Sequence, residues 1–117
     1  MREIDWSFTD KIVFINLEKR EDRRLQIEAC LKRFGAPEAN ILRFGAIEDA
    51  RGAIGCARSH IEVLKMAQAE KWKNVLILED DFLFNEDGES IERMNSFTLN
   101  LRRYSWDVAM LSASYYI

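Results

Sequence analysis

Three consecutive carboxylates, Glu79, Asp80 and Asp81, directly follow an apolar run at residues 75–78. Three neighbouring negative charges repel one another, and partial desolvation next to an apolar strand would strengthen that repulsion. A divalent cation would remove the conflict, and carboxylate oxygens suit Mg²⁺ or Mn²⁺. In extended backbone Glu79 and Asp81 point to the same side and could share one metal, while Asp80 points elsewhere. The alternative interpretation is a solvated acidic turn at the end of a strand.

A basic cluster follows the first apolar run of the chain, at residues 12–15. The cluster consists of Lys19, Arg20, Arg23 and Arg24. Cations near the start of a helix oppose the helix dipole, so a bound anion such as a phosphate would account for them. Alternatively they form an exposed helical face, with ion-pair partners among Glu18, Glu21 and Asp22.

A third segment that could take part in binding or catalysis spans residues 52–60. It contains two glycines, a cysteine, a serine and the only histidine. Gly55 permits close backbone approach, and Ser59 and His60 are predicted in the first turn of a helix. A lone histidine is more often a structural hydrogen-bonding residue than a catalyst. With one histidine and no paired cysteine, a zinc site is not expected. Cys30 and Cys56 are interpreted as reduced, half-buried thiols.

The elements that must position these groups follow from short apolar runs separated by helical spacing. Runs at residues 12–15, 41–44, 75–78 and 108–111 predict four strands. A first helix is predicted with Ile27, Leu31 and Phe34 on its apolar face, ended by Gly35 and Pro37. A second helix begins near residue 55 or 56, and its predicted core face is Ala57, Ile61, Leu64 and Ala67. A third helix, capped by Ser90, has a predicted face of Ile91, Met94, Leu101 and Tyr104.

This alternation predicts an α/β layer fold with a mostly parallel sheet. Ligands of such folds bind at the carboxyl ends of the strands, where the acidic run, the basic cluster and the glycine-containing segment all lie. The sequence shows no internal repeat, linker or low-complexity tract.

The composition is that of one soluble globular domain: 117 residues, 48% hydrophobic and 32% charged. A formal net charge of −3 argues against general nucleic-acid binding. The N-terminus carries acids where a signal peptide would be apolar, and no apolar stretch approaches the roughly 20 residues of a membrane span. We therefore expect a cytoplasmic protein, with peripheral contact with a membrane left open.

Four segments together resemble glycosyltransferase family 25, which includes bacterial lipopolysaccharide and lipooligosaccharide galactosyltransferases and the collagen galactosyltransferases. The matching segments occur in the family's order and lie at residues 14–24, 55–60, 76–81 and 106–108. The resemblance implies a Rossmann-like, GT-A type three-layer fold that binds a nucleotide diphosphate sugar. It also implies inverting transfer of a hexose, galactose above all, from a UDP-sugar to a glycan or lipooligosaccharide acceptor.

The resemblance further implies site residues. Glu79 and Asp81 would be the metal ligands for Mn²⁺ or Mg²⁺, with Asp81 as the catalytic residue. The metal would bridge the donor diphosphate and act as a Lewis acid for the departing nucleotide. The residues expected at or near the nucleotide sugar are Asn16, Leu17, Arg20, Asp22, Arg23, Gly55, Ser59, His60 and Asp80.

Family members usually continue well past the fourth predicted strand, so we expect residues 1–117 to be a single but incomplete nucleotide-sugar-binding domain, its N-terminal nucleotide-binding half. One alternative function is therefore a truncated, non-catalytic nucleotide-sugar-binding module. A signalling receiver domain is a second alternative, but receivers carry their acidic pair after the first strand, where this chain has Asn16 and Leu17. An apolar C-terminal side formed by Tyr115, Tyr116 and Ile117 predicts a homodimer.

Overall fold

A computed structural model describes residues 3–84 and 87–111, and contacts divide the chain into two compact units. The sheet unit is Thr9–Phe84, and the helical unit comprises the described residues of 1–8 and 85–117. The prediction that residues 1–117 form a single nucleotide-sugar-binding domain stays a prediction.

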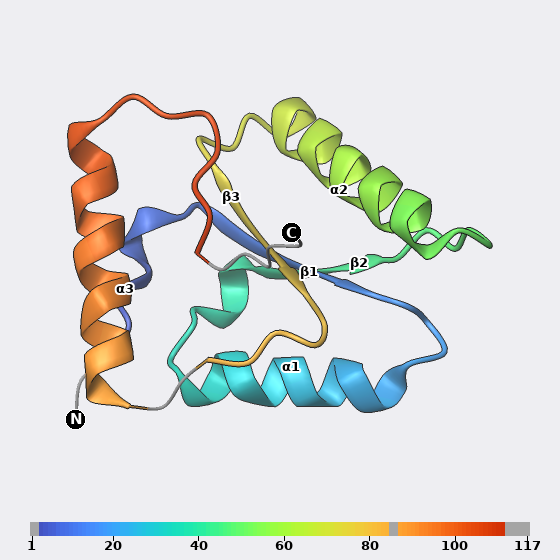
Figure 1. The fold of residues 1–117 in the computed structure, drawn as a ribbon, viewed down its shortest axis with the longest axis horizontal. Helices are drawn as coiled ribbons and strands as arrows, with labels where there is room; N and C mark the ends of the chain where they lie inside the picture. Colours follow the sequence, from blue (N-terminus) through green and yellow to red (C-terminus); the bar gives the residue numbers. More distant parts are fainter. Residues whose placement is uncertain (1–2, 85–86, 112–117) are drawn as a thin grey trace, which may run out of the picture. The chain divides into compact units, whose positions relative to one another are not determined.

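The sheet unit is an α/β fold with a three-stranded parallel sheet in the order β2-β1-β3 (Figure 1). Its elements are β1 (Lys11–Asn16), α1 (Glu21–Arg33), β2 (Ile41–Gly45), α2 (Gly52–Ala69) and β3 (Val75–Glu79). The three predicted strands at 12–15, 41–44 and 75–78 are confirmed. In the central strand, Ile12 pairs with Ile41 on one side and with Leu76 on the other.

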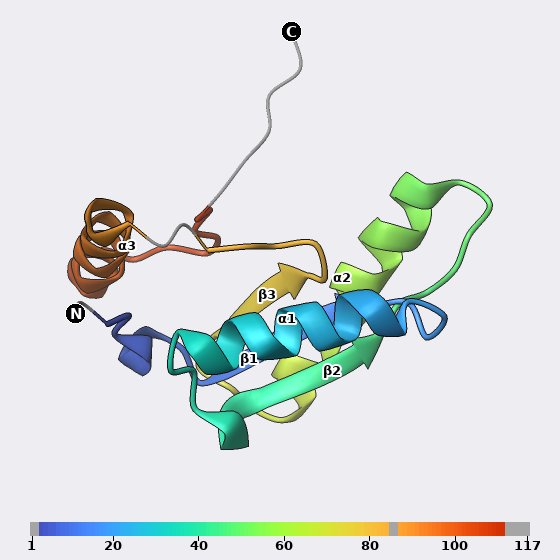
Figure 2. The same cartoon turned by 90° about the horizontal axis from the view of Figure 1, so that it is seen from below.

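The two helices of the sheet unit lie on opposite faces of the sheet, which makes three layers (Figures 1 and 2). Val13 and Ile15 of β1 form a buried cluster with Val63 of α2. Because side chains alternate along a strand, Ile12 and Phe14 face the other side, towards α1. Burial on both faces explains the continuous apolar run of β1 and confirms the predicted Rossmann-like α/β arrangement.

Helix α1 ends as its sequence predicts. Ile27 and Leu31 are fully buried, and Gly35 has a φ of 77°. The amide of Gly35 donates to the Lys32 carbonyl at 3.1 Å, and the amide of Ala36 donates to the Leu31 carbonyl at 3.0 Å. These two bonds form a Schellman motif, in which the left-handed position favours glycine.

Helix α2 differs from its prediction in both its start and its buried face. It begins at Gly52, and its buried residues are Gly55, Ser59, Val63 and Ala67. Of the predicted core face only Ala67 is buried, whereas the side chains of Ala57, Ile61 and Leu64 are exposed. Side-chain size explains which face is buried. The small residues Gly55, Ser59 and Ala67 allow α2 to pack more closely against the rest of the sheet unit than larger apolar residues would.

The helical unit contains η1 (Trp6–Phe8), α3 (Gly88–Asn100) and η3 (Leu101–Arg103). The predicted cap of α3 is wrong: Asp87 is the N-cap, and its carboxylate accepts from the amide of Ser90 at 2.7 Å. Ile91 is buried as predicted, but Leu101 lies beyond α3 and the Tyr104 side chain is 71% exposed. The helix therefore ends before its apolar pattern does.

The predicted fourth strand at residues 108–111 is absent. Val108 and Met110 are 77% and 64% exposed. A strand requires a hydrogen-bonded neighbour, and the described residues of the helical unit contain no strand that could pair with this run. Tyr115, Tyr116 and Ile117 lie outside the described residues, so the homodimer stays a prediction.

Within residues 3–84 and 87–111, no helix has both the length and the apolar character needed to span a bilayer. The cytoplasmic location stays a prediction.

Candidate active site

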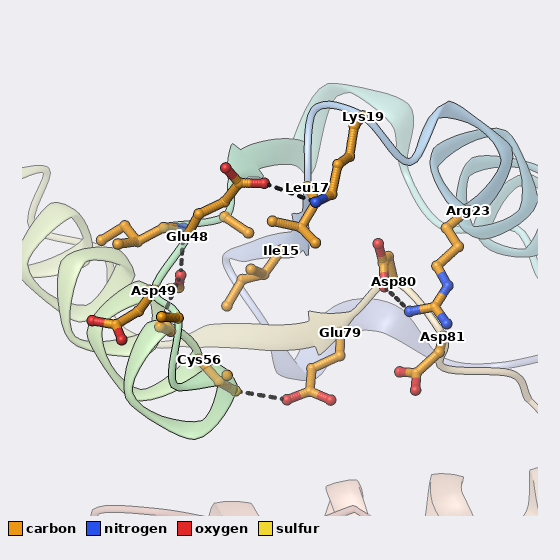
Figure 3. A pocket seen from close by; sticks show the side chains of 16 residues that line it. Ile15, Leu17, Lys19, Arg23, Glu48, Asp49, Cys56, Glu79, Asp80 and Asp81 are labelled. Carbon is orange, nitrogen blue, oxygen red and sulfur yellow. Dashed lines mark hydrogen bonds and ion pairs between the residues drawn. The ribbon is translucent and has the colours of Figure 1, made fainter.

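A cavity of about 580 Å³ opens at the carboxyl ends of β1 and β3 (Figure 3). The chain runs from β1 to β2 on one side and then to β3 on the other, so these two strands flank the point at which the strand order reverses. Open α/β sheets bind their ligands at such a switch point. The cavity is lined by the end of β1, the loop 46–50, the start of α2 and the acidic run after β3.

The acidic run forms one wall of the cavity. Glu79 is the last residue of β3, and the amide of Phe82 donates to its carbonyl at 3.0 Å, which closes a turn through Asp80 and Asp81. Figure 3 shows the side chains of Glu79 and Asp81 on one side and Asp80 on the other, as predicted. The expected desolvation holds only for Asp80, whose side chain is 12% exposed. Glu79 and Asp81 are exposed, because they lie at and just beyond the end of the strand.

Asn16 holds Asp80 in place. Its side chain is buried, and its amide nitrogen donates to Asp80 Oδ2 at 2.8 Å and to the Arg20 carbonyl at 3.1 Å. Its amide oxygen accepts from Arg43 Nε at 3.0 Å. Arg23 adds an ion pair to Asp80 Oδ1 at 3.5 Å. Asn16 thus joins the ends of all three strands, and its predicted contact with the nucleotide stays a prediction.

Arg20 and Asp22 bind each other. The guanidinium donates from Nε and from an Nη to the two oxygens of Asp22, both at 3.0 Å. The hydrogen bonds from Arg20 lower the pKa of Asp22 to about 2. Neither residue lines the cavity. This pair matches the alternative interpretation of an ion-paired helical face, and the predicted nucleotide contacts of both residues remain untested.

The other basic residues of the cluster also have carboxylate partners. Arg24 pairs with Glu28 at 3.0 Å, one turn further along α1. Lys19 pairs with Glu48 at 3.3 Å, and both side chains are well exposed. Lys19 and Arg23 line the cavity, so the cluster contributes two cations to it.

Gly55 provides the predicted close approach, but to the protein's own loop. A Cβ atom at this position would lie 2.6 Å from the Ile47 carbonyl oxygen. One turn later, Ser59 is fully buried; its hydroxyl accepts from the Ile47 amide and donates to the Gly55 carbonyl, both at 2.9 Å. These two residues therefore fix the loop that forms the cavity wall. Leu17, also predicted at the site, lines the cavity near β1.

Cys56 and His60 meet Glu79 from α2. The Cys56 thiol donates to Glu79 Oε1 at 3.1 Å, and His60 Nε2 lies 3.8 Å from the same oxygen. The hydrogen bond to Glu79 raises the pKa of Cys56 to about 11, with burial and Asp81 adding to the shift. Cys56 is exposed rather than half-buried. Because α2 begins at Gly52, Ser59 and His60 lie beyond its first turn.

Two acidic residues of the cavity were not predicted from the sequence. Glu48 and Asp49 follow β2 and line the cavity. The Asp49 side chain is 18% exposed and accepts from the Arg51 amide at 2.8 Å. Their place after a parallel strand was a usable signal, since the carboxyl ends of all three strands meet at one edge.

Residues 50–115 match the sequence profile of glycosyltransferase family 25, described as an LPS biosynthesis protein. The chain belongs to glycosyltransferase family 25. The match covers more than half of the chain and includes α2 and the acidic run, while Asn16 and the basic cluster precede it. No curated protein and no solved structure matches the chain. Family membership implies glycosyltransferase activity in lipopolysaccharide biosynthesis.

Proposed function

We propose that this family member is a metal-dependent, inverting hexosyltransferase that transfers galactose from UDP-galactose to a glycan or lipooligosaccharide acceptor. One observation carries the proposal. At the switch-point cavity, Asp80 is fixed by Asn16, while Glu79 and Asp81 present their carboxylates together on the other side (Figure 3).

The acidic residues fit a hard divalent cation. Carboxylate oxygens are the ligands that Mn²⁺ and Mg²⁺ prefer. Within the described ranges, Asp81 has no hydrogen bond or ion pair, so its oxygens are available. Glu79 and Asp81 would hold the cation, which when bound supplies Lewis-acid stabilisation for the departing UDP.

The opposite walls of the cavity suit a diphosphate. Lys19 and Arg23 bring positive charge to it, and Asp80 keeps the Arg23 guanidinium directed at the acidic edge. Helix α2 begins there at Gly52 without a side-chain cap from Arg51. A helix start carries partial positive charge and amide donors, which favour phosphate.

Apolar residues complete the cavity near β1. Ile15 and Leu17 line it beside the cations, which gives a mixed surface suited to a nucleoside or sugar face. Galactose as the sugar, UDP as the nucleotide and inversion at the anomeric carbon rest on the resemblance to the family's galactosyltransferases.

A donor hydrolysis and transfer assay tests the proposal. UDP-galactose and UDP-glucose are each incubated with the protein, with Mn²⁺ or with EDTA, and UDP release is measured. We expect Mn²⁺-dependent release that favours UDP-galactose and is lost in Asp81→Asn. Glu62→Gln, which alters an exposed carboxylate paired with Lys65 on α2, serves as the control. Equal turnover with EDTA, or with Asp81→Asn, would refute the metal role.

A further inference from the structure

Three side chains of types that commonly bind metal ions lie close together beside the cavity. Cys56 Sγ, a ring nitrogen of His60 and a carboxylate oxygen of Glu79 all lie within 4.8 Å of one another. All three residues belong to the sheet unit, and Glu79 and Cys56 also line the cavity. Asp80 and Asp81 are not members of this group.

The backbone holds the three groups in position. Cys56 and His60 are four residues apart on α2, so they share one face of the helix. Zinc-binding helices use two ligands at this same spacing. Glu79 reaches the pair from the end of β3, whose register is fixed by pairing with Ile15 of β1.

The distances are close to those of a tetrahedral site. Zinc bonds of about 2.0–2.3 Å place neighbouring ligand atoms about 3.5 Å apart. Here Cys56 Sγ and His60 Nε2 lie 3.1 Å and 3.8 Å from Glu79 Oε1. The third separation, from Cys56 Sγ to a ring nitrogen of His60, is within 4.8 Å, so rotations of these partly or fully exposed side chains would bring the three atoms to this spacing. Because Cys56 is exposed, a fourth position stays open to water.

The donor set selects the cation. A thiolate and an imidazole favour soft or borderline ions such as Zn²⁺ and Co²⁺, whereas Mg²⁺ and Mn²⁺ favour oxygen ligands. We propose that Cys56, His60 and Glu79 form a second cation site, specific for a divalent ion of the Zn²⁺ class. This site shares Glu79 with the carboxylate pair of the proposed function and differs from it in its other ligands, a thiol and an imidazole in place of Asp81. One histidine and no paired cysteine indicate no zinc site in the sequence, but the fold brings Glu79 beside Cys56 and His60.

Cobalt binding tests the site without any nucleotide. The reduced protein is titrated with Co²⁺, and the thiolate-to-cobalt charge-transfer absorption in the near ultraviolet is recorded. We expect this absorption in the wild type and its removal by Zn²⁺ but not by excess Mg²⁺. Because the absorption requires a thiolate, Co²⁺ on Glu79 and Asp81 alone gives none. The absorption therefore reports on Cys56 and not on a cation held by Glu79 and Asp81.

Variants assign the ligands. Cys56→Ser should abolish the absorption, and His60→Gln should weaken Co²⁺ binding by more than about 10-fold, the cost that even an outer partner of a metal site carries. Cys30→Ser, which removes the other thiol, should leave the absorption unchanged. Asp81→Asn should also retain it. Circular dichroism checks that each variant is folded. Absence of the absorption in the wild type, its persistence in Cys56→Ser, or unchanged affinity in His60→Gln would overturn the proposal.

Discussion

The buried side-chain amide of Asn16 donates a 2.8 Å hydrogen bond to Asp80, 64 residues further along the chain. This bond crosses the switch point between β1 and β3 and turns Asp80 away from its acidic neighbours (Figure 3). Two of the three carboxylates are thereby left together on the open side. The hydrogen bond between Asn16 and Asp80 thus sets how the carboxylates are oriented at the edge of the sheet.

Asn16→Ala should lower the free energy of unfolding by about 3 kcal/mol. The substitution removes the hydrogen bond from Asn16 to Asp80 and the hydrogen bond from Arg43 to Asn16 in a mostly buried place, and each hydrogen bond to a charged group is worth about 1.5–3 kcal/mol. Urea unfolding followed by circular dichroism measures the change. Asn100→Ala, at an exposed position, should stay within about 0.5 kcal/mol of the wild type. A similar small effect for both variants would show that the Asn16 network does not stabilise the sheet edge.

Two glycines of α2 give a matched pair of alanine variants. Gly55→Ala should destabilise the protein by about 1–3 kcal/mol, because the new Cβ would press on the Ile47 carbonyl at 2.6 Å. Gly52→Ala meets nothing within 4 Å and should be neutral or stabilising by up to about 1 kcal/mol. Thermal unfolding of both variants checks this. Equal Tm values would mean that the loop 46–50 does not lie against Gly55.

The strands could be predicted from the sequence because their signal is local. Each of the runs at 12–15, 41–44 and 75–78 is short and mainly apolar, and each forms a strand. The run at 108–111 has the same character and does not, since pairing depends on a neighbour that local composition cannot reveal. For the same reason, local sequence could not predict the hydrogen bond between Asn16 and Asp80, which are far apart in the chain.

Helix faces were harder to predict than strands. The larger apolar residues Ile61 and Leu64 suggested the buried face of α2, yet Gly55 and Ser59 lie inside. Their burial follows from the backbone of the loop at Ile47, which only small or hydrogen-bonding residues can approach. The meeting of Cys56, His60 and Glu79 likewise depends on how α2 lies against β3.

Lys71→Gly should stabilise the protein by about 0.5–1 kcal/mol. Lys71 has a φ of 58° at the end of α2, and its amide and that of Trp72 bond back to Gln68 and Ala67 at 3.2 and 3.0 Å. This is the Schellman position that glycine usually fills, and a side chain there costs about 1–2 kcal/mol of stability. The net gain from glycine is smaller, because glycine also makes the unfolded chain more flexible. Lys73→Gly, two residues on, is the control. A lower Tm for Lys71→Gly would contradict this account of the helix end.

Cys56 should react slowly with alkylating reagents. Its pKa is raised from an ordinary value near 9 to about 11, so at pH 8 its reactive thiolate is about 100-fold scarcer than in a free thiol. The rate should rise about 10-fold per pH unit between pH 8 and 10. Iodoacetamide labelling of the Cys30→Ser protein in EDTA, followed by mass spectrometry, measures it. Because Glu79 is the main cause, Glu79→Gln should speed labelling at pH 8 at least about 10-fold. No acceleration would mean that the thiol does not bond to Glu79.

The central claim is that Glu79 and Asp81 bind the donor diphosphate through a divalent cation. Isothermal titration of UDP with Mn²⁺ and with EDTA, for the wild type and for Asp81→Ala, tests it most directly. We expect UDP affinity to rise at least about 10-fold with Mn²⁺ in the wild type, and this gain to disappear in Asp81→Ala. Equal UDP affinity in all four titrations would contradict the claim.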